Sequence, residues 1–122
     1  MSRAILLVDH GSRLPEAHSY LEQLGEEIRR RSEGTAVYLA HLELVPPTID
    51  DAIVACVDAG IRDLIVHPLF LIPGRHARKD VPAAVERAAS RHPGLRVHVT
   101  EPLGQAADLA DLILRIIGRA DS

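Results

Sequence analysis

The sequence predicts a three-layer α/β/α domain built on a four-stranded parallel sheet. Short apolar segments alternate with longer segments whose apolar residues recur at helical spacing, and this alternation is repeated four times along the 122 residues. Strands that alternate with helices of this length are joined by right-handed crossovers into a parallel sheet, with helices on both faces. No linker or repeat marks a second unit, so we expect one domain over residues 1–122.

The expected strands are compact apolar segments bounded by turn residues. They are residues 3–8, 35–44, 62–72 and 95–100. The third is almost continuously apolar, which is typical of a strand buried on both faces, and it breaks at Pro73-Gly74. The first ends at Asp9-His10-Gly11-Ser12, where a glycine and a capping type of residue indicate a turn.

The expected helices carry their own start and stop signals. They are residues 15–31, 49–59, 81–91 and 105–119. The first has glutamates early and arginines late, as the helix dipole favours. Thr48 precedes the second and Gly60 ends it, whereas Asp80 is expected to cap the third at Val81-Pro82. The fourth is apolar over much of its circumference.

Composition excludes several classes of function. A net charge of −3 gives no basic footprint, and one phenylalanine with two tyrosines offers little for base stacking, which argues against a nucleic-acid partner. No segment approaches the ~18 apolar residues of a membrane span, and residues 1–8 run at once into Asp9, unlike a signal peptide. The single cysteine, Cys56, is expected in the core. We therefore expect a soluble, cytoplasmic protein, in which seven histidines are the one compositional excess.

Titratable or metal-binding side chains follow every expected strand. In parallel sheets ligands bind at the carboxyl ends of the strands, where these side chains would meet. In strand order they are His10, Ser12 and Arg13; His41 and Glu43; Arg75 and His76; and Glu101. Arg78 and Lys79 extend the positive charge of the third loop. This convergence predicts a site with two histidines and a carboxylate.

Such a set of side chains suits a protein that binds a metal ion and then passes it on. Neutral imidazole binds cobalt, nickel, iron and zinc, and its pKa near ~6.5 also lets it accept a proton at neutral pH. A closed structural site needs about four ligands, often at spacings such as CxxC, which are absent here. Two or three ligands on separate strand exits would form an open, weaker site from which a metal can be passed on.

Several motifs resemble the short, single-domain sirohydrochlorin chelatases of the class II chelatase group. The resemblance covers residues 3 to 117 in the right order. Its motifs are residues 8–13 (VDHGSR), 40–44 (AHLEL) with 47–49 (PTI), 66–71 (VHPLFL) with 73–76 (PGRH) and 80–82 (DVP), and 101–104 (EPLG).

The resemblance implies a chelatase-like fold of flavodoxin-like topology, with no organic cofactor. The implied activity is insertion of Co²⁺ or Fe²⁺, with Ni²⁺ a further candidate, into sirohydrochlorin on the way to cobalamin or sirohaem. The two histidines of the family fall on His10 and His76, and Glu43 stands where its carboxylate is expected. All three are the candidate metal ligands and catalytic groups, with imidazole accepting the pyrrole protons and Glu43 balancing charge or relaying them.

The substrate is ringed by carboxylates, which basic side chains can bind. The candidate binding residues are Ser12, Arg13, Arg75, Arg78 and Lys79. Larger relatives hold the tetrapyrrole between two similar domains, whereas one is expected here. We therefore expect a homodimer that shares the cleft, consistent with surplus apolar surface on the last helix at Leu109, Leu112, Ile113 and Ile116.

Structural roles are the alternatives for the individual residues. Ser12 lacks a Gly-x-Ser-x-Gly elbow and more simply caps a helix, and Glu43 could cap the second helix. His41 is a supporting group or a strand-end surface residue, and His67 is expected in the core, bonded to backbone. The remaining histidines, His18, His92 and His98, are expected at the surface or in turns.

Two other classes of function compete with the chelatase interpretation. Histidine phosphatases place an arginine directly before the histidine of their His-Gly pair, but Asp9 stands there in this sequence. A flavodoxin-like module that binds a metal or tetrapyrrole without catalysis would share the topology. A flavin is disfavoured in such a module, because the chain has no obvious aromatic pair and no glycine-rich phosphate loop after the first strand.

Overall fold

The computed structural model describes residues 3–72 and 74–120, apart from the side chains of residues 75–77. Its elements are β1 (Arg3–Asp9), α1 (Pro15–Arg31), β2 (Ala36–His41), α2 (Ile49–Asp58), β3 (Asp63–Pro68), α3 (Arg75–Ala89), β4 (Arg96–Val99), a 3₁₀ turn η1 (Leu103–Gln105) and α4 (Leu109–Ala120). The strands form one parallel sheet in the order β2-β1-β3-β4. The predicted fold class is therefore confirmed.

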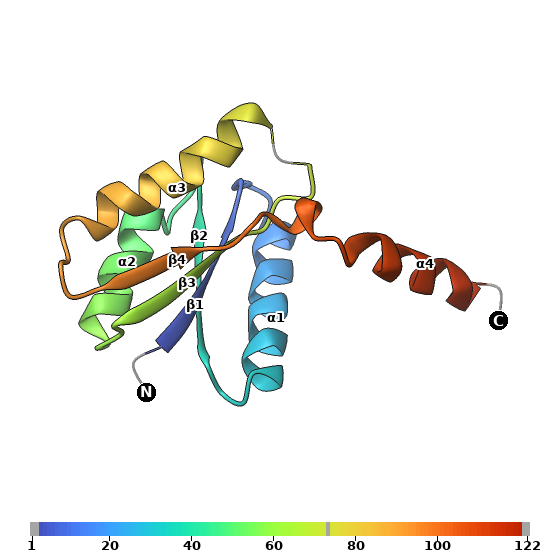
Figure 1. The fold of residues 1–122 in the computed structure, drawn as a ribbon, viewed down its shortest axis with the longest axis horizontal. Coiled ribbons are helices and arrows are strands. Elements are labelled where there is room, and N and C mark those ends of the chain that lie inside the picture. The colour runs from blue at the N-terminus through green and yellow to red at the C-terminus, as the bar shows by residue number, and fades with distance from the viewer. Residues whose placement is uncertain (1–2, 73, 121–122) are drawn as a thin grey trace.

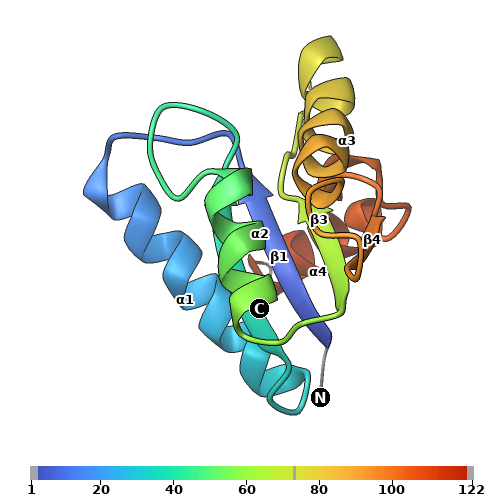
Figure 2. The same cartoon turned by 90° about the vertical axis from the view of Figure 1, so that its left-hand side faces the viewer.

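The helices lie on both faces of the sheet (Figures 1 and 2). Helices α2 and α3 pack side by side on one face, and α1 covers the β2 side of the other face. The core lies between the sheet and the α2–α3 pair, where Leu6, Val66, Ile53 and Val81 are almost fully buried. Cys56 belongs to this core, as predicted, and burial raises the pKa of its thiol to about 11.

Local sequence signals explain where α1 and α2 begin. Pro15 occupies the first turn of α1, where its missing N–H has no partner to lose. Helix α2 begins with a capping box, in which the Asp51 amide donates to Thr48 Oγ1 at 3.1 Å and the Thr48 amide donates to the Asp51 carboxylate at 2.9 Å. Within the described residues, no helix is both long and apolar enough to cross a membrane.

Two helix starts differ from the sequence prediction. Helix α3 begins at Arg75 behind Gly74, which is extended and holds the N-cap position, so Asp80 is not a cap and Pro82 lies inside the helix. A proline within a helix loses its own hydrogen bond and crowds the carbonyl of the preceding turn. Here the neighbouring Val81 is fully buried, and its packing offsets part of this cost. Helix α4 starts at Leu109 because η1 precedes it.

Candidate active site at the carboxyl ends of the strands

The loops after β1 and β2 are locked together by their backbones. The Leu42 amide donates to the Asp9 carbonyl at 2.9 Å, and the Glu43 amide donates to the His10 carbonyl at 3.1 Å. Gly11 has φ +107°, and a Cβ at this position would lie 2.0 Å from the Glu43 carbonyl oxygen. Only glycine permits this approach, which brings His10 and Glu43 to neighbouring positions.

His10 and Glu43 face each other across this junction. Nε2 of His10 lies 3.4 Å from Oε1 of Glu43, and their side chains are 60% and 59% exposed. The His10 ring meets the buried Phe70 ring edge to face, with centroids 5.5 Å apart. An ion pair this exposed stabilises a fold by only about 0–1 kcal/mol. The arrangement matters more because it holds an accessible imidazole and an accessible carboxylate at one place.

Neither Glu43 nor Ser12 caps a helix. Thr48 caps α2, which leaves Glu43 with His10, so the capping alternative for Glu43 is wrong. Ser12 Oγ accepts a hydrogen bond from the Leu14 amide at 3.1 Å and shapes the turn, while Leu14 holds the N-cap position of α1 without a side-chain bond. Arg13 between them is exposed to solvent.

Two histidines, the buried His41 and the half-buried His18, contact each other and the residues of these loops. Nδ1 of His41 lies 2.5 Å from Oδ1 of Asp9, and since a carboxylate only accepts, the imidazole donates. His41 is 3% exposed, so it is not the strand-end surface residue that was one alternative. The His18 ring stacks on it at 4.8 Å, and His18 Nε2 donates to the Ser12 carbonyl at 2.7 Å.

This cluster of Asp9, His18 and His41 was missed as a unit by the sequence analysis. Asp9 and His41 are the last residues of neighbouring strands and are register partners. A signal existed, because Asp9 directly precedes His10 and His41 stands two residues before Glu43, but strand order and register cannot be read from one sequence.

The candidate site residues that follow β3 lie at the start of α3. His76 and Arg75 lie in the first turn of this helix, not in a loop as predicted, and their side chains are outside the described part of the structure. Arg78 and Lys79 follow in the next turn and are exposed. Figure 1 shows the start of α3 at the same end of the sheet as the loop after β1. Pro73, where the strand was predicted to break, also lies outside the described residues.

The segments that follow β3 and β4 are also joined by a backbone hydrogen bond. The Gly104 amide donates to the Phe70 carbonyl at 2.9 Å, and a Cβ at Gly104 would lie 1.7 Å from the Leu71 carbonyl oxygen. Glu101 lies at this exit and is exposed. Phe70 therefore contacts both the segment after β4, through its carbonyl, and the His10 ring, through its side chain.

His67 is half-buried, but its partner is a side chain and not the predicted backbone group. Nδ1 of His67 lies 2.8 Å from Oγ1 of Thr100. The Thr100 hydroxyl donates its only hydrogen to the Glu101 carbonyl, so the imidazole must be the donor to Thr100. Burial lowers the pKa of His67, and the nearby Glu101 carboxylate opposes this in part.

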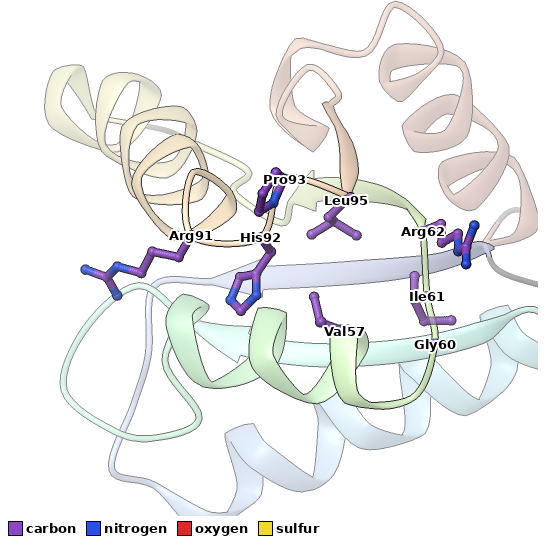
Figure 3. Close-up of a pocket in the computed structure, with 9 residues that line it drawn as sticks. Val57, Gly60, Ile61, Arg62, Arg91, His92, Pro93 and Leu95 are labelled. Atoms are coloured by element: carbon purple, nitrogen blue, oxygen red, sulfur yellow. The ribbon is translucent and has the colours of Figure 1, made fainter.

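A hollow of about 620 Å³ lies at the opposite end of the molecule, between the ends of α2 and α3 (Figure 3). Its lining mixes Val57, Ile61 and Leu95 with His92, and Arg62 lies at its rim. Parallel sheets bind ligands at the carboxyl ends of their strands, and this hollow lies at the amino ends. We therefore assign the site to the His10 end. Among the side chains that the structure describes, no three His, Cys, Asp or Glu groups form a cluster able to hold a metal, which leaves His10 with Glu43 as a pair.

A family model described as CbiX matches residues 4–120. The chain is 38% identical to the chloroplastic sirohydrochlorin ferrochelatase of Arabidopsis thaliana, over 89% of this chain and 48% of that protein. It is 39% identical to a sirohydrochlorin cobaltochelatase of Methanococcus maripaludis, over 65% of this chain and 55% of that protein. The chain thus spans about half the length of these relatives.

Solved structures share the fold over almost the whole chain. The sirohydrochlorin chelatase SirB of Bacillus subtilis subspecies spizizenii, solved in complex with cobalt, matches 98% of this chain and 51% of its own at a TM-score of 0.82 and 32% identity. A putative cobalamin biosynthesis CbiX protein of Marinobacter aquaeolei matches 97% of this chain and 96% of its own, with a TM-score of 0.81 and 32% identity. SirB of Bacillus subtilis has also been solved with Fe³⁺.

Proposed function

The chain belongs to the CbiX family, and on that premise we propose that it inserts Co²⁺ or Fe²⁺ into sirohydrochlorin for cobalamin or sirohaem biosynthesis. Ni²⁺ is a third candidate metal. The observation that carries the proposal is the pairing of an exposed imidazole with an exposed carboxylate at the carboxyl ends of the strands, the end of the sheet at which α3 also begins (Figure 1). That end is where an α/β sheet of this kind binds its ligands.

In the proposed reaction the metal ion replaces two protons on the macrocycle. The ion arrives hydrated, His10 and His76 take the place of part of its water, and the pyrrole nitrogens then bind it as their two N–H protons leave. Once the ion has passed to the macrocycle, the imidazoles of His10 and His76 would each accept one of the two protons. Glu43, whose Oε1 lies 3.4 Å from Nε2 of His10 and is open to solvent, would pass the proton of His10 to water. The products are the metallated macrocycle and two protons, so charge and atoms balance.

The pair of the buried His41 with the half-buried Asp9 would position the residues for this step. Asp9 directly precedes His10, and His41 stands two residues before Glu43. Their short hydrogen bond fixes the last residues of β1 and β2 relative to each other. The distance between His10 and Glu43 is thereby kept, although both side chains face solvent.

Basic residues at the same end would bind the substrate carboxylates. Arg13, Arg78 and Lys79 are exposed and have no ion-pair partner among the described side chains. Arg75 extends the same group in the sequence. Ser12 is a weaker binding candidate, because its hydroxyl already accepts from the Leu14 amide. A guanidinium can hold a carboxylate by two parallel hydrogen bonds.

Two copies would share one cleft in this proposal. The chain spans about half of its longer relatives, so a second copy would supply a second unit of the same size. A homodimer with the two strand ends facing each other would enclose a planar macrocycle. Sedimentation velocity at the working concentration tests this, and a monomer would contradict the pairing.

Metal insertion is tested directly by absorption spectroscopy. The protein is incubated with sirohydrochlorin and Co²⁺, Fe²⁺ or Ni²⁺, and the spectrum of the metallated product is followed against a reaction without protein. We expect acceleration with at least one metal. A spectral shift that needs no metal, with no acceleration by any of the three, would instead indicate a binding module without catalysis. The cytoplasmic setting expected from the sequence stays a prediction.

A further inference from the structure

Leu44 has a strained backbone conformation directly beside Glu43. Its φ is +76°, in the left-handed region that favours glycine and is costly for a leucine. The Val45 amide donates to the Glu43 carbonyl at 3.0 Å, which closes a three-residue γ-turn around Leu44. Such turns with a positive φ are rare, and strained residues of this kind concentrate at functional sites.

Burial of its side chain does not explain why Leu44 adopts this conformation. The residue is 55% exposed, so it contributes little to the core. The turn is nevertheless fixed in place, because the Glu43 amide donates to the His10 carbonyl and the Glu43 carbonyl lies against Gly11. The strained turn therefore holds an apolar side chain in solvent at a fixed position beside the pair of His10 and Glu43.

Other large apolar side chains are exposed at the same end of the sheet. Leu14 follows β1 and is 63% exposed, and Leu71 and Ile72 follow β3 and are 59% and 90% exposed. Among the described residues outside α4, the other large apolar side chains that are exposed are Tyr20 and Val54. Exposed apolar surface outside α4 is thus concentrated where the strands end, as expected of a surface that binds another molecule.

The charges around these apolar residues match a ring with acidic edges. Arg13 directly precedes Leu14, and Arg78 and Lys79 lie in the helix that follows Ile72; all three cations are exposed. A tetrapyrrole macrocycle has two broad apolar faces and carboxylates around its periphery. Apolar side chains can pack against such a face while the cations bind the carboxylates at its edge.

We propose that the strained turn holds Leu44 in position to contact the face of the tetrapyrrole macrocycle, next to the metal-binding pair of His10 and Glu43. The inference rests on the proposed function and deepens it, because it assigns a residue that contacts the ring itself. Leu44 directly follows Glu43 in a fixed turn, so its contact with the ring sets how closely the pyrrole nitrogens approach Glu43. The strain is the cost of a rigid contact of this kind.

The test compares substrate binding with stability in the same variants. Binding of metal-free sirohydrochlorin is measured by absorption titration, and stability by urea unfolding. Leu44→Asn removes the apolar contact but tolerates a positive φ. We expect its dissociation constant for sirohydrochlorin to rise roughly tenfold, because the ring would cover about half of a leucine side chain. Its midpoint of urea unfolding should stay the same or rise, because the strain is relieved.

Two further variants isolate the apolar contact from the strain. Leu44→Met keeps an apolar side chain and should bind sirohydrochlorin nearly as tightly as the parent. Glu33→Asn is the matched control, because Glu33 is an exposed residue with φ +59° in the turn after α1, at the opposite end of the sheet. Its unfolding midpoint should also stay the same or rise. Its dissociation constant should not rise, since loss of a negative charge favours an acidic ligand.

The outcomes separate this inference from the proposed activity. A parent protein that binds sirohydrochlorin but inserts no metal contradicts the activity, and the Leu44 variants still test the contact. A parent that inserts metal, with a Leu44→Asn variant that binds the macrocycle equally tightly, overturns the inference alone. So does a Leu44→Asn variant whose sedimentation changes while its affinity for sirohydrochlorin does not, because Leu44 would then contact a second copy. A parent that binds no sirohydrochlorin overturns both.

Discussion

At the scale of single residues, the candidate site has an exposed layer over a buried one. His10 and Glu43 are both open to solvent, whereas His41 beneath them is 3% exposed and bonded to Asp9. An exposed ion pair contributes little free energy, so the contact between His10 and Glu43 cannot by itself fix their positions. Their positions are fixed by the backbone hydrogen bonds between the two loops and by the hydrogen bond between Asp9 and His41.

The two candidate histidines can be tested by truncation. His10→Ala and His76→Ala each remove a ligand and a proton acceptor, and loss of such a group typically costs about a hundredfold or more in rate. We expect each variant to lose turnover while its thermal unfolding stays close to that of the parent, because His10 is exposed. His92→Ala, at the opposite end, is the matched control and should keep full activity. Full rate in either site variant would show that its histidine is neither ligand nor base.

His67 makes the stability of the fold depend on pH. Its pKa in the folded protein is lowered from the ordinary 6.5, so the folded state prefers the neutral ring. This stabilisation is complete above about pH 6.5 and is lost as the pH falls through the folded-state pKa. Urea unfolding on both sides of that range should therefore show a smaller free energy of unfolding at the acidic end.

The contribution of His67 is isolated by comparison with variants. His67→Gln keeps a polar group near Thr100 and should reduce the loss of stability on acidification, whereas His92→Gln should not. Equal acid sensitivity in the parent and in His67→Gln would show that the burial of His67 does not govern the loss of stability in acid.

At the scale of elements, one glycine sets how closely the loops after β1 and β2 approach. Gly11→Ala combines a strained φ of +107° with a clash at 2.0 Å, and we expect a loss of about 3 kcal/mol or more together with most of the activity. Gly34→Ala is the matched control, because Gly34 has φ +88° with nothing within 4 Å of its Cβ position. It should cost only about 1–2 kcal/mol and leave turnover unchanged. Equal losses in both variants would contradict a role for the close approach.

Most elements could be predicted because their signals are local. The helix spacing and Pro15 indicated α1, and Thr48 with Gly60 bounded α2. The start of α3 was predicted wrongly because Pro82 was interpreted as a first-turn residue, although a packed helix tolerates it further inside. The ends of two strands were predicted too late, because the apolar residues continue past them: β2 ends at His41 and not at residue 44, and β3 ends at Pro68 and not at residue 72.

The contacts between segments that follow different strands could not be predicted, because they depend on strand order and register. The bond from His41 to Asp9 joins residues 32 positions apart, and the approach of Gly104 to Leu71 needs both loops in place. A single sequence carries no record of such pairs. The sequence therefore indicated candidate site residues, and the structure adds the contacts that hold His10 and Glu43 next to each other.

At the scale of the whole molecule, positive charge lies at the site end of a chain whose net charge is −3. Exposed Arg13, Arg78 and Lys79 can attract a polyanionic substrate over a distance that shrinks from about 10 Å at 0.1 M salt to about 3 Å at 1 M. We expect the KM for sirohydrochlorin to rise with salt while kcat changes little.

Two matched variants distinguish the effect of positive charge at the site on the KM from the effect of overall net charge. Arg13→Gln should raise the KM at low salt and flatten its salt dependence. Arg62→Gln makes the same change in net charge beside the distant hollow and should do neither. If both variants shift the KM equally, overall charge and not the site governs substrate binding.

The glycines at the amino ends of the strands make the protein easy to label. Cβ atoms at Gly34 and Gly94 would meet nothing within 4 Å, in contrast to Gly11 and Gly104, where carbonyl oxygens stand in the way. These two turns lie opposite the candidate site and are suited to insertion of an affinity tag or a fluorophore. A reporter there would leave catalysis undisturbed, so capture on a surface or single-molecule counting of subunits could be carried out on working protein.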